Sequence, residues 1–145
     1  MTTAAVIALG FGLTSCGGNA AGERPGRAVQ AFLESAQRAE RDERALAEVH
    51  TMLCASSRRW LQTRAERASA LAGRTFEPWE MLVPGRIRLR VEPSAATVIR
   101  EQVQGSSATV TLVDRSGTRA EVPLVLEADG WKLALELAPG GEPDS

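Results

Sequence analysis

Hydrophobic side chains recur every three or four residues in the first half of the chain, which is the period of an α-helix with one buried face. The first such run predicts a helix over residues 26–40, with Pro25 in its first turn. Asp42 is expected to cap a second helix, and Ser56 or Ser57 a third that ends at Gly73. The apolar faces of the three helices hold Val29, Phe32, Leu33 and Ala36, then Leu46, Val49 and Leu53, then Leu61, Ala65, Ala68 and Ala72.

After Gly85 the hydrophobic spacing changes to every second residue, the period of a half-buried strand. Turn residues separate the segments, most clearly at Asp129-Gly130 and between Asp114 and Gly117. Pro123 predicts an edge position or a bulge in its strand. The expected strands, four or five in an antiparallel meander, cover residues 87–91, 97–103, 108–113, 120–126 and 131–137.

A sheet with one apolar face must bury that face, and the helices are the available cover. We therefore predict an α+β fold in which the N-terminal helices pack in the concavity of a curved antiparallel sheet. The chain of 145 residues is 43% hydrophobic and 24% charged, as expected for one globular domain. Its net charge of −1 provides no overall attraction to nucleic acid or to an anionic membrane surface, and no nucleic-acid partner is predicted.

Residues 4–13 form an apolar run that is too short to span a bilayer but fits the core of a secretory signal. The run ends in Leu13-Thr14-Ser15-Cys16, which resembles the lipobox of bacterial lipoproteins. The resemblance implies that the Cys16 thiol receives a diacylglyceryl group and that a signal peptidase cuts before it. Residues 1–15 would then be the signal peptide and residues 16–24 a flexible tether to the lipid anchor.

The predicted location is the bacterial cell membrane or outer membrane, with the domain lipid-anchored and facing the periplasm or the exterior. Gly17 after the cysteine favours the outer membrane. No Lys or Arg precedes Arg24, although signal peptides usually begin with a basic residue. A true start upstream of Met1 or an inefficient signal would account for this. The alternative interpretation is an apolar N-terminal strand or helix followed by a Gly-rich turn.

The two cysteines are expected to differ. With Cys16 acylated, Cys54 has no partner for an intrachain disulfide. We expect Cys54 to be a small buried hydrophobic residue. Together with His50 it offers too few ligands for a metal site, so no metal and no cofactor is predicted.

Three segments, "AVQAFLESAQ", "DERALAEVHTMLCASSRRWL" and "AEVPLVLEADGWKLAL", resemble the nuclear transport factor 2-like (cystatin-like) domains of small bacterial lipoproteins. The resemblance covers residues 25–138 and leaves 139–145 as a tail expected to be disordered. It implies a cone-shaped domain with a pocket between helices and sheet, and a homodimer formed through the sheet. Enzymes of this fold place acids or an Asp/His base in the cone, several with a Tyr that stabilises an oxyanion, and this chain has no Tyr.

Three groups are candidates for chemistry, each with a structural alternative. His50 is either a base in the cone or a hydrogen-bonded core histidine. Glu77 and Glu80 flank Trp79. A carboxyl group beside an aromatic ring could have a raised pKa, or the segment could be a loop whose Phe76 and Trp79 plug the cone. A row of arginines on one strand could bind an anion or pair with glutamates across the sheet. These residues are Arg86, Arg88 and Arg90, with Glu101, Glu121, Glu127 and Glu136 as the partners.

The sequence favours the structural interpretation of each group, and no catalytic residue is assigned. The predicted function is a lipid-anchored, non-enzymatic module of the cell envelope that binds a small hydrophobic ligand or an envelope protein. Its membrane contact is the acylated Cys16. The alternative is a small isomerase-like or cyclase-like enzyme of the same fold, using His50 or Glu80 in the cone.

Overall fold

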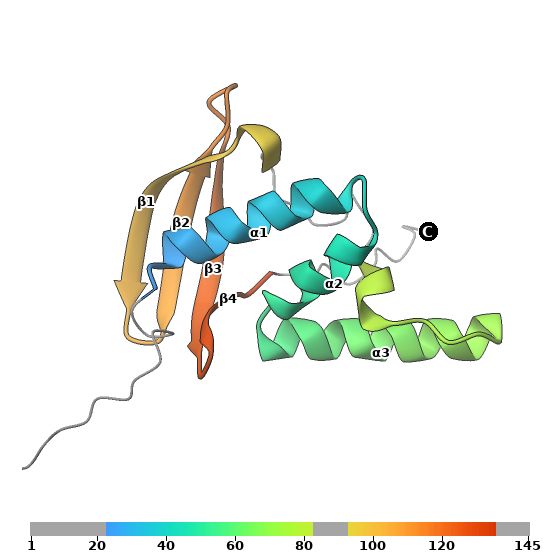
Figure 1. Cartoon of the computed structure of the whole chain (residues 1–145). Helices are drawn as coiled ribbons and strands as arrows, with labels where there is room; N and C mark the ends of the chain where they lie inside the picture. Colours follow the sequence, from blue (N-terminus) through green and yellow to red (C-terminus); the bar gives the residue numbers. More distant parts are fainter. Residues whose placement is uncertain (1–22, 83–92, 136–145) are drawn as a thin grey trace, which may run out of the picture.

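Three α-helices precede a four-stranded antiparallel sheet in the computed structural model, which describes residues 23–82 and 93–135 (Figure 1). The predicted α+β class is therefore confirmed. The expected strand at 87–91 with its arginine row, and the end of the last strand, lie outside the described residues. The elements are α1 (Pro25–Ala39), α2 (Arg44–Thr51), α3 (Ala55–Ala72), the short 3-10 helices η2 (Pro78–Met81) and η3 (Pro93–Ala95), and the strands β1 (Thr97–Gln104), β2 (Ser107–Val113), β3 (Arg119–Glu127) and β4 (Gly130–Leu133).

The strands follow one another in the sheet in the order β1-β2-β3-β4. Inward-facing residues lie opposite one another, for example Val110 and Val122. β3 lies between β2 and β4, so the edge position predicted from Pro123 is wrong. The Pro123 carbonyl accepts the Ala134 N–H at 2.8 Å, one residue beyond β4. Because proline has no N–H to donate in return, it is tolerated where the pairing of β4 ends.

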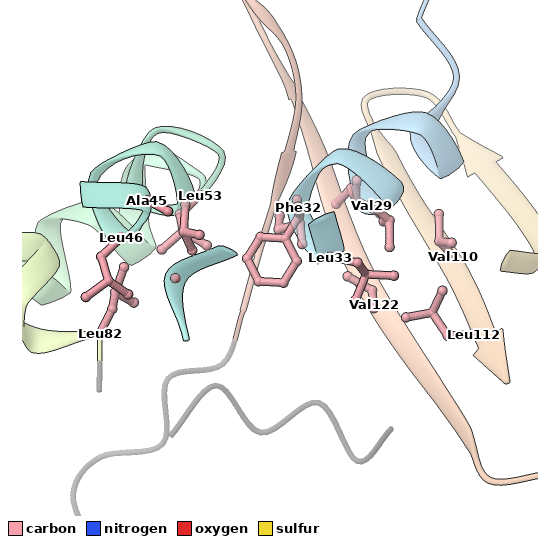
Figure 2. Packing of buried hydrophobic residues seen from close by; sticks show 14 of the residues in the cluster. Val29, Phe32, Leu33, Ala45, Leu46, Leu53, Leu82, Val110, Leu112 and Val122 are labelled. Carbon is pink, nitrogen blue, oxygen red and sulfur yellow. The ribbon is translucent and has the colours of Figure 1, made fainter. Parts of the chain in front are cut away.

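α1 crosses the sheet (Figure 1), and its buried side chains include Val29, Phe32 and Leu33. Phe32 is fully buried and lies between the sheet residues and those of α2 (Figure 2). One continuous hydrophobic cluster thus joins the helices to the sheet. Its fully buried large members are Val29, Phe32, Val49, Leu53, Leu61, Leu82, Val110, Leu112, Val122, Leu124 and Leu133.

The start of α1 is held against β1 by a polar contact. Glu101 Oε1 lies 3.3 Å from Arg24 Nη2, just before the helix begins. A Cβ on Gly26 would lie 2.5 Å from this carboxylate oxygen, so a larger residue at that position would have to displace the Glu101 side chain. The expected position of Glu101 on the outer sheet face is wrong, because its carboxylate lies at the start of α1 and pairs with Arg24.

The helix ends differ in part from the predicted caps. Gly73 adopts the left-handed conformation (φ 68°) and ends α3 as predicted. The N-cap of α3 is Cys54, so the prediction of Ser56 or Ser57 is wrong. Asp42 lies one residue before the N-cap of α2, and its carboxylate accepts the Arg44 N–H at 3.0 Å. Its predicted position as the cap is thus displaced by one residue.

The segment between α2 and α3 joins the helices to the sheet through its main chain. The Cys54 N–H donates to the Leu133 carbonyl, and the Leu133 N–H donates to the Met52 carbonyl, both at 2.9 Å. Leu53 and Leu133 form a parallel β-bridge, and both side chains are fully buried. This segment therefore covers the outer edge of β4 and positions the first turn of α3.

The central position of Phe32 predicts a large loss of stability on truncation. We expect Phe32→Ala to lower the free energy of unfolding by about 3–5 kcal/mol, because it removes buried surface and leaves a cavity. Leu71→Ala is the control, since Leu71 is 90% exposed and should change stability by less than about 0.5 kcal/mol. Urea unfolding followed by far-UV circular dichroism measures both. Equal effects would show that Phe32 is not central to the core.

Candidate functional site

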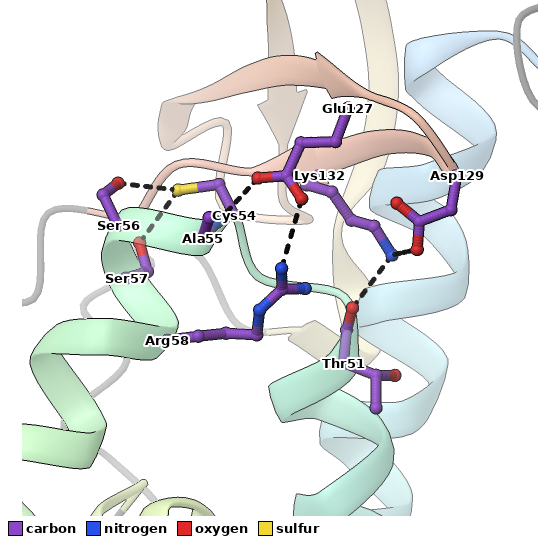
Figure 3. Close-up of polar contacts among 9 residues, drawn as sticks. All are labelled: Thr51, Cys54, Ala55, Ser56, Ser57, Arg58, Glu127, Asp129 and Lys132. Carbon is purple, nitrogen blue, oxygen red and sulfur yellow. Dashed lines mark hydrogen bonds and ion pairs between the residues drawn. The ribbon is translucent and has the colours of Figure 1, made fainter.

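A cluster of polar contacts joins the start of α3 to the β3–β4 hairpin (Figure 3). Glu127, the last residue of β3, accepts the Ala55 N–H at 2.6 Å with Oε1 and pairs with Arg58 at 3.2 Å through Oε2. A carboxylate from a distant strand thus binds one of the free N–H groups at the N-terminus of α3, where negative charge is favourable. Glu127 is therefore a positioning residue for α3.

Cys54 lies beside this contact and is 3% exposed. Its Sγ is 3.1 Å from Ser56 Oγ and 3.3 Å from Ser57 Oγ, and Ser57 in turn donates to the Leu135 carbonyl at 3.2 Å. Burial raises the pKa of the Cys54 thiol, but hydrogen bonds from both serines, through side chain and backbone, lower it by more. The net pKa is lower than the ordinary value. The expectation of a buried Cys54 is confirmed.

Lys132 holds the other end of the hairpin to α2. Its Nζ lies 2.9 Å from Asp129 Oδ2 and donates to the Thr51 carbonyl at 3.0 Å (Figure 3). The hydrogen bond from Lys132 lowers the pKa of the Asp129 carboxyl. Asp129 therefore acts as a turn residue, in agreement with the predicted hairpin turn.

His50 lies on α2 with its ring edge-to-face against Trp79, the centroids 6.3 Å apart. Its Nε2 is buried and has no hydrogen-bond partner among the described residues. Burial, and secondarily the charge of Arg58, lowers the pKa of His50. The neutral imidazole is therefore the favoured form in the fold.

Glu80 is bonded to the local backbone and to Arg74. Its Oε2 accepts the Glu77 N–H at 2.6 Å, and its Oε1 lies 3.5 Å from Arg74. Glu77 and Glu80 form the capping box of η2. The structure thus places the His50 ring against Trp79. The carboxylates of Glu77 and Glu80 instead bind the backbone of η2.

Sequence reasoning missed the role of Glu127 because its partners lie about 70 residues earlier in the chain. No local pattern signals such a contact. Within residues 23–82 and 93–135, no three of the His, Cys, Asp and Glu side chains are placed to hold a metal ion. The predicted acylation site Cys16 and the arginine row lie outside these residues.

Comparisons of the chain with protein-family models, with curated proteins and with solved structures find no match. Any function therefore rests on the geometry of the described residues and on the N-terminal sequence motif.

The bond between Glu127 and α3 predicts a specific loss of stability. Glu127→Ala removes the acceptor of the Ala55 N–H and the partner of Arg58, and we expect it to cost about 1–2 kcal/mol. Glu121→Ala, an exposed position on the same strand, is the matched control and should change stability by less than about 0.5 kcal/mol. Urea unfolding measures both, and equal values for the two variants would contradict the assigned role.

The lowered pKa of His50 predicts a pH dependence of stability. Below about pH 6.5, the ordinary histidine pKa, the unfolded chain binds a proton that the folded chain binds only at lower pH. The free energy of unfolding should therefore fall as the pH drops below this value. In His50→Phe, which retains an aromatic ring against Trp79, this part of the slope should be absent. Urea unfolding between about pH 5 and 8 tests the difference, and parallel curves would refute it.

Proposed function

We propose that this chain is a bacterial lipoprotein whose nuclear transport factor 2-like domain is a non-enzymatic binding or interaction module of the cell envelope. The anchor is a diacylglyceryl group on Cys16. The single observation that carries the proposal is the motif Leu13-Thr14-Ser15-Cys16 at the end of a short apolar run.

The position of the folded domain supports the anchor. α1 begins at Pro25, so residues 16–24, which include four alanines or glycines before Gly22, separate Cys16 from the fold. Arg24 pairs with Glu101 at the point where this segment meets α1. The other cysteine is a core residue, which leaves Cys16 as the thiol available for acylation. A tether followed by a firmly attached first helix is the arrangement that an anchored domain needs.

The nuclear transport factor 2-like assignment is supported by the order of elements. Three helices precede an antiparallel meander, and α1 lies across one face of the sheet.

No helix in the described part of the chain is both long and apolar enough to cross a bilayer.

The non-enzymatic character is supported by the structural roles of the candidate catalytic groups. Glu80 binds the backbone of η2 and Arg74, and Cys54 is enclosed by the first turn of α3. The enzymatic alternative rests on His50, whose buried Nε2 has no partner among the described residues. A histidine that serves as a base is normally oriented by a second group, and neither Glu77 nor Glu80 is bonded to His50.

Metabolic labelling with a fatty-acid analogue in a bacterial host tests the anchor. We expect the wild-type chain to be labelled and Cys16→Ala to lose the label completely, because the thiol is the acceptor. Cys54→Ala is the matched control, since it removes the other cysteine and should retain the label. Mass spectrometry of the labelled protein should place Cys16 at the new N-terminus. Labelling that persists in Cys16→Ala, or cleavage at another residue, would refute the proposal.

A further inference from the structure

Basic residues outnumber acidic ones on α3 and the turn that follows it. Residues 55–76 contain five arginines and one acidic residue, whereas the chain as a whole has a net charge of −1. Arg58 pairs with Glu127 and Arg74 with Glu80. Within the described residues, Arg59, Arg64 and Arg67 form no ion pair, so most of this charge is uncompensated.

Two of these arginines lie on one face of α3 together with Trp60, which is partly buried and packs against the core cluster, and with the exposed Leu71. We call Trp60, Arg64, Arg67 and Leu71 the α3 stripe, because their spacing i, i+4, i+7 and i+11 places them along one side of the helix. The Arg64 guanidinium lies 4.6 Å from the centre of the Trp60 ring. Leu71 is 90% exposed. Glu66 lies off the stripe and accepts a hydrogen bond from Gln62 at 2.9 Å.

The exposed end of the stripe is held rigidly. The buried residues of α3 are Ser57, Leu61 and Ala65, so its last turns extend away from the sheet (Figure 1). After Gly73 the chain reverses, and the Phe76 N–H donates to Ser69 Oγ at 2.9 Å. Leu71 and Arg67 are thus presented on an ordered helix end and not on a fraying one.

We propose that the α3 stripe docks on the anionic phospholipid surface of the membrane. At a bilayer surface the guanidinium groups of Arg64 and Arg67 would meet lipid phosphates, and the exposed Leu71 would enter the headgroup region. The chemistry recognised is a sheet of lipid phosphates. Arg64 and Arg67 are complementary in charge to this surface, and the exposed Leu71 lies on the same side of the helix.

The inference builds on the proposed acyl anchor, which would keep α3 close to a bilayer. Residues 16–24 span at most about 30 Å when extended, and α3 is about 27 Å long. Each arginine near such a surface contributes about 1 kcal/mol of binding, and the acyl chains raise the local concentration.

Co-sedimentation with vesicles tests this surface in the full chain carrying Cys16→Ala, which has no acyl group. We expect binding to phosphatidylcholine vesicles that contain phosphatidylglycerol, and much weaker binding to phosphatidylcholine alone. Adding Arg64→Gln and Arg67→Gln should weaken binding to the anionic vesicles about 30-fold. The control adds Arg100→Gln and Arg119→Gln, two exposed strand arginines, which removes the same charge and should weaken binding less than about threefold.

Leu71→Gln gives a second measurement, because it removes the apolar contact without changing charge. It should weaken anionic-vesicle binding several-fold and leave the free energy of unfolding unchanged. Equal binding to neutral and anionic vesicles, or equal loss in the two double-arginine variants, would overturn the proposal. Binding of the stripe to an acidic protein in place of vesicles would overturn it as well. Since the tested chain is unacylated, a negative result would not affect the acylation proposal, which fatty-acid labelling decides separately.

Discussion

Two main-chain hydrogen bonds connect the helical half of the protein to its sheet. They join Leu133 of β4 to Met52 and Cys54, on either side of the bridging Leu53. The start of α3 and the end of α2 are thereby placed against the hairpin, and Glu127 and Lys132 can reach Ala55 and Thr51. The bonds are protected because Leu53 and Leu133 are fully buried on either side. Opening backbone hydrogen bonds that are shielded from water costs free energy, so this junction fixes the positions of α2 and α3 relative to the sheet.

Much of the fold could be predicted from periodicity, because burial of one face is a local property of the sequence. The spacing around Phe32 predicted α1 to within one residue, and the alternation from Val110 to Leu112 and from Val122 to Leu124 predicted the two central strands. The bridge at Leu53 could not be predicted, since it pairs a connecting segment with a strand about 80 residues later. The edge position predicted from Pro123 was wrong for a related reason. A proline is tolerated in an inner strand where the neighbouring strand stops, and the sequence does not show where β4 stops.

The candidate site could be predicted only in outline. The position of His50 on an apolar helix face indicated that its ring lies inward, and the segment containing Trp79 was expected to close the core. The hydrogen bonds of the nearby glutamates could not be predicted, because they are either tertiary contacts or contacts within a short 3-10 helix. Glu80 caps η2, and Glu127 caps a helix from a distant strand. On α3, the exposure of Leu71 could not be predicted, because it depends on how far the helix extends beyond the elements that support it.

The contact between Arg24 and Glu101 has a mechanical consequence for a chain held at its N-terminus. Any drag on the domain would be transmitted through residue 24 into the first turn of α1. Glu101 on β1 shares that load, and Gly26 allows the helix and strand to lie close enough to do so. If the chain is anchored at Cys16 as proposed, tension would thus reach α1 and β1 before it reaches the hairpin that holds α2 and α3.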